Sequence, residues 1–165
     1  MRMMGVDPGL SGALALIDTR TGEVVVDDMP VRVLSTRRVR RRGKMVTKVK
    51  KVVDGKAIGD WIEKHQPHRA CIELVGSRPH QGVSTTFTFG EAYGCASGAI
   101  ESMNVPLDRV TPLVWKRKLG LIGASKRGSL ELARRKYKHA AKRLARTRDN
   151  GRAEALLIAE YATLH

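Results

Sequence analysis

An aspartate ends the first apolar segment of the chain and is followed at once by a glycine-rich turn, in the run Gly5-Val6-Asp7-Pro8-Gly9-Leu10-Ser11-Gly12. Pro8 fixes φ, while Gly9 and Gly12 permit a positive φ or the close approach of another backbone. An apolar run restarts at Leu14, so the sequence predicts a β-hairpin with Asp7 near one edge. Because a buried carboxylate loses hydration, a metal ion or a cation is expected beside it. The alternative is an ordinary Asp-Pro-Gly turn.

The length of 165 residues predicts a single domain over residues 1–165, with a core that needs no disulfide. Cys71 and Cys95 stand in apolar sequence without zinc-site spacing, so we expect reduced, buried thiols. The chain runs from Met1-Arg2 directly into a strand-like segment, and no apolar run approaches the roughly 20 residues of a membrane span. We therefore expect an unprocessed cytoplasmic protein with no membrane partner.

Positive charge dominates the composition: 31 Lys and Arg against 16 Asp and Glu give a formal net charge of +15. Such an excess predicts a polyanionic partner, held through counterion release and electrostatic steering. An anionic membrane surface is the competing partner, but no basic helix with large apolar residues on its opposite face stands out. Nucleic acid is the favoured partner.

The densest positive charge lies between Arg32 and Lys51, a segment with ten Lys or Arg and no acid. Valines alternate with these cations well enough for a β-ribbon over about residues 31–53 that turns near Gly43. The alternative is a solvated, partly disordered loop, because like charges repel. In either form the segment can lie along phosphates, and the cations expected to bind DNA are Arg37, Arg38, Arg40, Arg41, Arg42, Lys44 and Lys48.

The rest of the chain predicts a mixture of strands and helices. Strands are expected over 22–30, 69–75 and 105–111, helices over 55–66, 90–103, 125–138 and 149–162, a helical turn over 112–116 and a loop over 76–82. Small residues in the 90–103 helix permit close packing, either on the chain's own sheet or on another chain.

Three of these segments carry acids that local structure does not require: Asp7, Glu73, and Asp149 with Glu154. Asp149 has an alternative role, because an acid near a helix N-terminus is favoured by the helix dipole. Oxygen ligands without His or Cys favour Mg²⁺ or Mn²⁺. Two such ions about 3.5–4 Å apart activate a water and stabilise the leaving oxygen at a phosphodiester. Together with the basic surface, these acids predict a metal-dependent nuclease.

Lys116 and Lys126 are the lysines best placed in the sequence to offset charge on a scissile phosphate, although plain phosphate binding is their alternative role. Further DNA contacts are expected from Arg78, His80, Gln81, Lys118 and Arg127. The sequence has no P-loop, HExxH, GxSxG or dinucleotide fingerprint, so we expect no nucleotide cofactor.

These stretches together resemble the RuvC-like Holliday junction resolvases of the ribonuclease H-like superfamily. The resemblance runs from residues 5–13 through Cys71-Ile72-Glu73 and residues 111–116 to Asp149-Asn150-Gly151-Arg152-Ala153-Glu154 and the helix after it. An Asp five residues before the Glu is similar to the branch that contains plant organellar (MOC1-type) resolvases and their bacterial and phage relatives.

The resemblance implies an α/β fold with a mixed five-stranded sheet flanked by helices, a homodimer, and two symmetric cuts in a four-way DNA junction. It implies two Mg²⁺ or Mn²⁺ ions per active site, in a bacterial cell or a phage-infected host. The family's metal ligands carry over to Asp7, Glu73, Asp149 and Glu154, and its active-site lysine to Lys126, while Lys116 follows the tryptophan of the 111–116 motif.

One feature departs from the family. Bacterial resolvases commonly place an aromatic wedge in the loop after the second acid, and residues 76–82 have no aromatic ring of the Phe, Tyr or Trp type. His80, Phe87 or Phe89 supplies the wedge, or it is absent.

Three other functions stay open at this point. A nuclease of the same fold acting on flaps, forks or RNA–DNA hybrids would use the same residues. A non-catalytic basic nucleic-acid-binding protein would use the acids as caps and turns. An actin-like nucleotide-hydrolysing domain is disfavoured, because the chain is short for two lobes.

Overall fold

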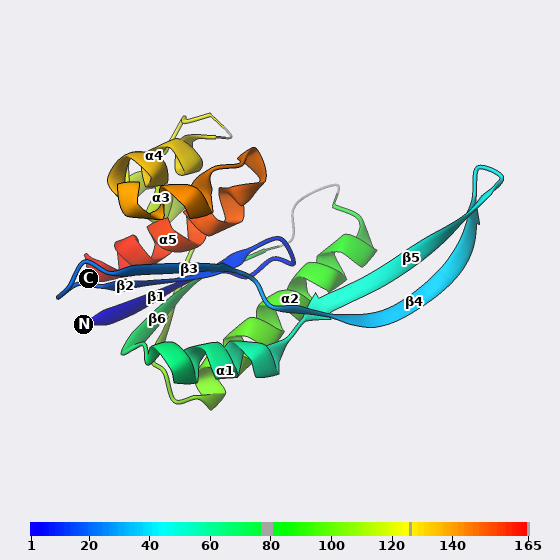
Figure 1. Ribbon diagram of the computed structural model, residues 1–165, viewed down its shortest axis with the longest axis horizontal. Helices are drawn as coiled ribbons and strands as arrows, with labels where there is room; N and C mark the ends of the chain where they lie inside the picture. Colours follow the sequence, from blue (N-terminus) through cyan, green and yellow to red (C-terminus); the bar gives the residue numbers. More distant parts are fainter. Residues whose placement is uncertain (77–80, 126, 165) are drawn as a thin grey trace.

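The computed structural model describes residues 1–76, 81–125 and 127–164 (Figure 1). Its main sheet has the strand order β3-β2-β1-β6-β7. β1 (Arg2–Asp7) and β3 (Val24–Asp28) both run antiparallel to β2 (Ala13–Asp18). β6 (Arg69–Glu73) runs parallel to β1, and β7 (Leu107–Val110) runs parallel to β6. This mixed five-stranded sheet, flanked by helices, confirms the expected fold class.

The glycine-rich turn joins β1 to β2 through close backbone contacts. The Gly12 N–H donates to the Gly9 carbonyl at 2.8 Å, and the Gly12 carbonyl accepts from the Met29 N–H at 3.0 Å. A Cβ at position 12 would lie 2.0 Å from the Asp7 carbonyl oxygen, so only glycine fits. The predicted hairpin is therefore confirmed, and its turn holds the backbone of Asp7.

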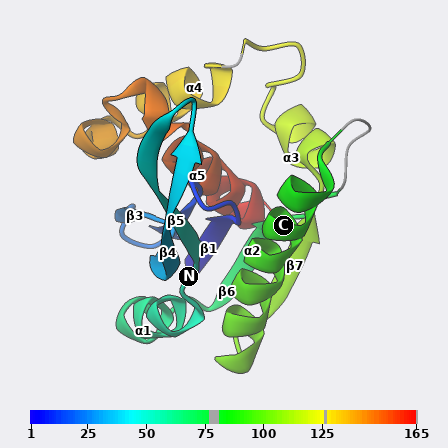
Figure 2. The ribbon, with the colours of Figure 1, turned by 90° about the vertical axis from the view of Figure 1, so that its right-hand side faces the viewer.

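Helices cover both faces of the sheet (Figures 1 and 2). α5 (Asn150–Thr163) and α4 (Gly128–Lys136) lie on one face, and α1 (Gly55–His65) and α2 (Val83–Ser102) lie on the other. Along β2, Ala13 and Ala15 pack in the core with α5, whereas Leu14 and Leu16 pack in the core with α1 and α2. This alternation is that of a strand buried on both faces.

α5 approaches β1 very closely. A Cβ at Gly5 would lie 2.1 Å from the Ala155 carbonyl oxygen, so the helix backbone rests directly on the strand. Two short 3₁₀ helices, η1 (Lys138–Leu144) and η2 (Thr147–Asp149), join α4 to α5, and α3 (Pro112–Lys118) follows β7. This packing brings the first turns of α5 to the carboxyl ends of β1 and β6.

The basic segment forms a β-ribbon, which is one of the two forms considered from the sequence. β4 (Val31–Arg41) pairs antiparallel with β5 (Lys44–Val53), and a register shift interrupts the pairing between Val33 and Ser35. The turn has positive φ at Arg42 (47°) and Gly43 (78°), as in the turns that match the twist of two-residue hairpins.

Several element ends differ from the predictions. α2 begins at Val83 rather than at residue 90, because the threonines before Gly90 enter the helix with their hydroxyls bonded to the preceding turn: Thr86 Oγ1 donates to the Gly82 carbonyl at 3.3 Å. α4 begins at Gly128 rather than at residue 125. Both cysteines are free, Cys71 buried and Cys95 partly exposed. None of the described helices is long and apolar enough to cross a lipid bilayer.

Candidate metal-binding active site

Asp7 and Glu73 lie at the same edge of the sheet. Asp7 is the last residue of β1 and Glu73 is the last residue of β6, and the two strands are parallel neighbours in which Val6 pairs with Ile72. The carboxyl ends of neighbouring parallel strands are a usual place for functional groups in α/β sheets. The two acids predicted from distant parts of the sequence are therefore brought together.

α5 adds Glu154 to this edge. A Cβ at Gly151, one turn before Glu154, would lie 3.2 Å from Asp7 Oδ2 and 2.4 Å from the Ser11 carbonyl oxygen. The first turn of the helix thus rests against Asp7 and its glycine turn. Only glycine allows this approach at position 151.

The charges of the three carboxylates act on one another. The pKa of Asp7 rises from 3.8 to about 7, first because burial disfavours its ionised form and next because Glu154 and Glu73 repel its charge. The Gly9 N–H, 3.5 Å from Asp7 Oδ1, and the Lys116 ammonium act in the opposite direction. Asp7 is therefore a carboxylate that a further cation would stabilise.

Glu73 is held by a tryptophan. The fully buried Trp115, on α3, donates its indole N–H to Glu73 Oε2 at 2.7 Å. This bond fixes one oxygen of Glu73. The sequence did not reveal this positioning role, because the two residues are 42 positions apart.

Glu154 has two partners. Ser129, on α4, donates its hydroxyl to Glu154 Oε1 at 3.2 Å, and Lys116 Nζ forms an ion pair with the same oxygen at 2.9 Å. The Lys116 ammonium also lies 4.9 Å from the centre of the Trp115 ring. Lys116, predicted as a catalytic lysine, is thus placed among the acids, while Ser129 is a partner that sequence reasoning missed.

The chemistry of this donor set fits a hard divalent cation. Asp7, Glu73 and Glu154 offer only oxygen atoms, and their repulsion is balanced in part by one ammonium group. In the conformation shown, no group of three or more His, Cys, Asp and Glu side chains among residues 1–76, 81–125 and 127–164 is close enough to hold a metal ion. Asp7, Glu73 and Glu154 are the residues that would hold such an ion.

The structure does not bring Asp149 to this group. Its carboxylate is 3% exposed and accepts hydrogen bonds from the Arg146 backbone N–H at 2.7 Å and the Arg146 guanidinium at 2.8 Å. Burial alone would raise the pKa of Asp149, but the bonds and charge of Arg146, with the charge of Arg152, hold it below its usual range. Arg152 in turn pairs with Asp28 on β3 at 2.6 Å. Asp149 therefore joins the start of α5 to an ionic network on the sheet.

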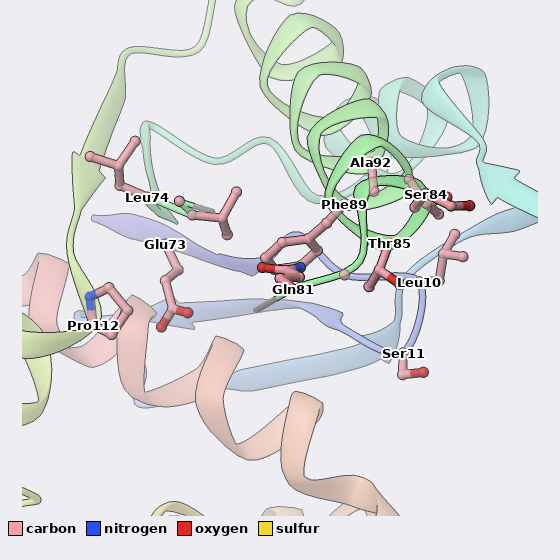
Figure 3. Close-up of a pocket in the computed structure, with 14 residues that line it drawn as sticks. Leu10, Ser11, Glu73, Leu74, Gln81, Ser84, Thr85, Phe89, Ala92 and Pro112 are labelled. Carbon is pink, nitrogen blue, oxygen red and sulfur yellow. The ribbon is translucent and has the colours of Figure 1, made fainter. Parts of the chain in front are cut away.

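A cleft of about 960 Å³ opens beside the acids. It is lined by the glycine turn, by the end of β6 with Glu73, and by the first turns of α2 with Phe89 (Figure 3). Gln81, a predicted DNA contact, also lines it. Phe87 lies on the same helix but is 70% exposed. The cleft gives an extended ligand direct access to Glu73.

The other predicted site residues have different outcomes. Lys126, Arg78 and His80 lie outside the described residues. Lys118 and Arg127 are exposed at the ends of α3 and α4. The ribbon cations are exposed along β4, the turn and β5: Arg37, Arg38, Arg40, Arg41, Arg42, Lys44 and Lys48.

Comparisons with known proteins agree with this picture. No protein-family model matches the chain. A crossover junction endodeoxyribonuclease RuvC of Acidovorax is 28% identical over 144 residues, which cover 82% of this chain and 72% of the relative. The protein of the same name from Paenarthrobacter aurescens is 28% identical over 115 residues, which cover 68% of this chain but only 56% of the relative.

Solved structures resemble the whole chain. RuvC of Thermus thermophilus in complex with a Holliday junction substrate has a TM-score of 0.57 at 12% identity, covering 99% of this chain and 95% of that chain. The yeast mitochondrial Holliday junction resolvase Ydc2 has a TM-score of 0.53 at 11% identity, covering 96% and 76%. The predicted resemblance to RuvC-like proteins is confirmed, and the finer placement in the MOC1-type branch stays a prediction.

Proposed function

We propose that this chain, a RuvC-like protein with a ribonuclease H-like fold, is a crossover junction endodeoxyribonuclease that resolves four-way DNA junctions by two symmetric, metal-dependent cuts. The observation that carries the proposal is the meeting of Asp7, Glu73 and Glu154 beside an open cleft. The net charge of +15 supports a nucleic-acid substrate. Such an enzyme acts in DNA recombination and repair, and its bacterial relatives favour a cytoplasmic location.

The proposed ligands are the three acids that the fold brings together. When bound, two Mg²⁺ or Mn²⁺ ions supply Lewis-acid stabilisation and an activated water for phosphodiester hydrolysis. Trp115 keeps one oxygen of Glu73 fixed, and Ser129 orients Glu154. Asp149 stays a predicted fourth ligand, which requires that Arg146 release its carboxylate.

Lys116 has a charge-balancing role in this proposal. Its ammonium pairs with Glu154 and lowers the pKa of Asp7. Beside a scissile phosphate, the same ammonium would stabilise developing negative charge. Lys126 stays a predicted second lysine for this task.

A homodimer suits a four-way junction, because a twofold enzyme meets two equivalent strands with the same surface. The α2 helix supports this arrangement. It packs on its own sheet through Ala92, Ala96 and Ile100, and exposes Gly90, Gly94 and Gly98, where an added Cβ would meet nothing within 4 Å. We propose that a second copy approaches this exposed side.

The remaining DNA contacts stay proposals. Lys118, Arg127 and the cations of the β4–β5 ribbon are exposed, Gln81 lines the cleft, and the predicted contacts Arg78, His80 and Lys126 lie outside the described residues. Exposed Phe87 and cleft-lining Phe89 are the aromatic candidates for opening the junction centre.

The experiment that tests this function compares substrates. A four-way junction, a matched linear duplex, a replication fork, a flap and an RNA–DNA hybrid are incubated with wild type or Asp7→Asn and Mg²⁺ or Mn²⁺. Cleavage confined to the junction and lost in the variant supports a resolvase. Equal or faster cleavage of forks, flaps or hybrids assigns the same acids to another nuclease. Junction binding without cleavage by either protein identifies a binding module.

A further inference from the structure

The two faces of the β4–β5 ribbon differ in charge. Cross-strand partners share a face, and successive residues alternate between faces. One face, here called the cationic face, carries the pairs Ser35–Lys50, Arg37–Lys48, Val39–Val46 and Arg41–Lys44. The other, the mixed face, carries Thr36–Val49, Arg38–Thr47 and Arg40–Met45. Of the ten cations of the segment, five thus lie on the cationic face and two on the mixed face.

Like charges stand directly opposite each other on the cationic face. Arg37 faces Lys48, and Arg41 faces Lys44. Such pairs destabilise a two-stranded sheet. Among the described residues, none of the ribbon cations forms a salt bridge with an acid of the chain. Binding of an external polyanion would therefore relieve the repulsion between the paired cations of this face.

On the mixed face each arginine has a neutral partner. Arg38 stands opposite Thr47 and Arg40 opposite Met45, so neither arginine has a like charge directly across the ribbon. Met45 and Val49, 54% and 45% exposed, add apolar surface there. This face lacks the paired charges that suit a continuous row of phosphates.

The ribbon is rooted firmly in the domain and projects from it (Figure 1). Val52 and Val53 are buried, the Asp54 N–H donates to the Pro30 carbonyl at 2.9 Å, and the Cys95 thiol donates to the Val53 carbonyl at 3.5 Å. The register shift between Val33 and Ser35 increases twist at the point where the ribbon leaves the core. A rooted ribbon presents its two faces in a defined orientation.

We propose that the cationic face lies along the sugar–phosphate backbone of one duplex arm of the DNA substrate, and that the mixed face is turned away from that backbone. This inference rests on the proposed nuclease function, and it adds which side of the ribbon makes the phosphate contacts. Charge complementarity selects the partner: Arg37, Arg41, Lys44, Lys48 and Lys50 form one row without an acid.

Two double variants separate the faces with equal loss of charge. Arg37→Gln with Arg41→Gln removes two arginines from the cationic face, and Arg38→Gln with Arg40→Gln removes two from the mixed face of the same strand. All four side chains are exposed, so both variants keep the wild-type thermal midpoint and circular dichroism spectrum. Binding to a four-way junction and to a plain duplex is measured in EDTA at salt concentrations from about 50 to about 300 mM, in steps of about 50 mM. Phosphate contacts dominate the affinity in this range.

Each phosphate contact contributes about 0.9 to the slope of log affinity against log salt. The cationic-face variant is expected to reduce that slope by about 1.8, for two contacts, while the mixed-face variant leaves it close to wild type. Equal reductions in both variants, a larger reduction in the mixed-face variant, or no reduction in either overturns the proposal. Because binding is measured without metal, failure of junction cleavage by the wild type refutes the proposed function separately.

Discussion

The Trp115 indole N–H donates to Glu73 Oε2 at 2.7 Å from a fully buried position. Glu73 ends β6 and lines the cleft, so this bond orients a carboxylate that faces the cleft from the end of the strand. Trp115 joins the site to the core beneath α5. The orientation of the proposed metal ligand thus depends on core packing.

Replacing Trp115 with Phe should weaken metal binding without removing a ligand. The aromatic ring still fills the core, but Glu73 loses its donor. Loss of such an outer-sphere partner typically costs 10–100-fold in metal affinity or activity, so we expect the Mg²⁺ concentration for half-maximal junction cleavage to rise by roughly 10-fold or more.

Trp61→Phe is the matched control for this change. Trp61 donates its indole N–H to Asp27 Oδ2 at 3.1 Å, and that bond holds none of the three clustered acids. The control should keep the wild-type Mg²⁺ requirement. An equal rise in both variants would assign the effect to general loosening of the fold.

Without metal, the contribution of Asp7 to the stability of the protein should fall as pH rises from about 4 to about 7. The pKa of Asp7 is 3.8 in the unfolded chain and about 7 in the folded one, because of burial first and of Glu154 and Glu73 next. The folded state therefore binds more protons within this window, and its advantage is lost above pH 7.

Asp7→Asn removes this dependence on pH. In EDTA at pH 8 the variant should unfold at a higher temperature than wild type, with a gain of at least ~1 kcal/mol or roughly 2–4 °C for a chain of this size. Below pH 4 the difference should vanish. Thermal scans from pH 3.5 to 8 check this, and a wild type that is the more stable protein at pH 8 would contradict it.

Asp149→Asn should lower the stability of the folded protein. The buried carboxylate joins Arg146 to the start of α5, and hydrogen bonds to charged groups contribute about 1.5–3 kcal/mol. Chemical denaturation measures the loss. Arg146→Gln should destabilise the protein by removing the same bonds from the other side.

These two variants distinguish two roles of Asp149, that of a metal ligand and that of a structural acid that ties Arg146 to the start of α5. If Asp149 is a metal ligand, its replacement raises the Mg²⁺ requirement, while Arg146→Gln frees the carboxylate and lowers that requirement. If Asp149 has only the structural role, neither variant changes the Mg²⁺ requirement. The Mg²⁺ dependence of cleavage therefore decides between the roles.

Gly151→Ala should damage the site through the backbone. A Cβ there would lie 2.4 Å from the Ser11 carbonyl oxygen, so α5 must move away from the Asp7 turn. Overpacking of this kind costs about 1–3 kcal/mol, and displacement of Glu154 should reduce cleavage. Gly59→Ala is the control, because its Cβ would meet only Met103 Sδ at 3.7 Å. Equal stability of the two variants would refute the close contact.

The sequence predicted the parts of the site that depend on local pattern. Asp7 ends an apolar strand at a glycine turn, so the hydrophobic period and the turn residues were sufficient to place it, whereas the strand of Glu73 was predicted to continue to residue 75 and ends at Glu73. Asp149 was ambiguous, because a position at the start of a helix suits both a ligand and a cap. Its pairing with Arg146 is a local contact three residues apart, whereas the link from Arg152 to Asp28 on β3 depends on tertiary packing. Trp115 and Ser129 required the same non-local information.

The structure of the ribbon was likewise predictable from the sequence only in part. Alternating valines predicted the strands, whereas charge repulsion favoured a loop, and local pattern could not weigh one against the other. The register shift between Val33 and Ser35 then decides which cations share a face. A prediction in which side chains alternate between the two faces without interruption from Val31 does not contain this shift. It could therefore not specify which residues of the two strands pair.

The central claim is tested most directly by mapping cuts on one four-way junction with all four strands labelled in turn. With Mg²⁺, wild type should nick two opposing strands at symmetric positions near the crossover. Asp7→Asn should bind the junction but cut it at least ~100-fold more slowly, a larger loss than removal of a hydrogen-bond partner of a metal ligand causes. Undiminished cleavage by Asp7→Asn, or scattered single nicks equally frequent in a linear duplex, would contradict a junction resolvase built on Asp7, Glu73 and Glu154.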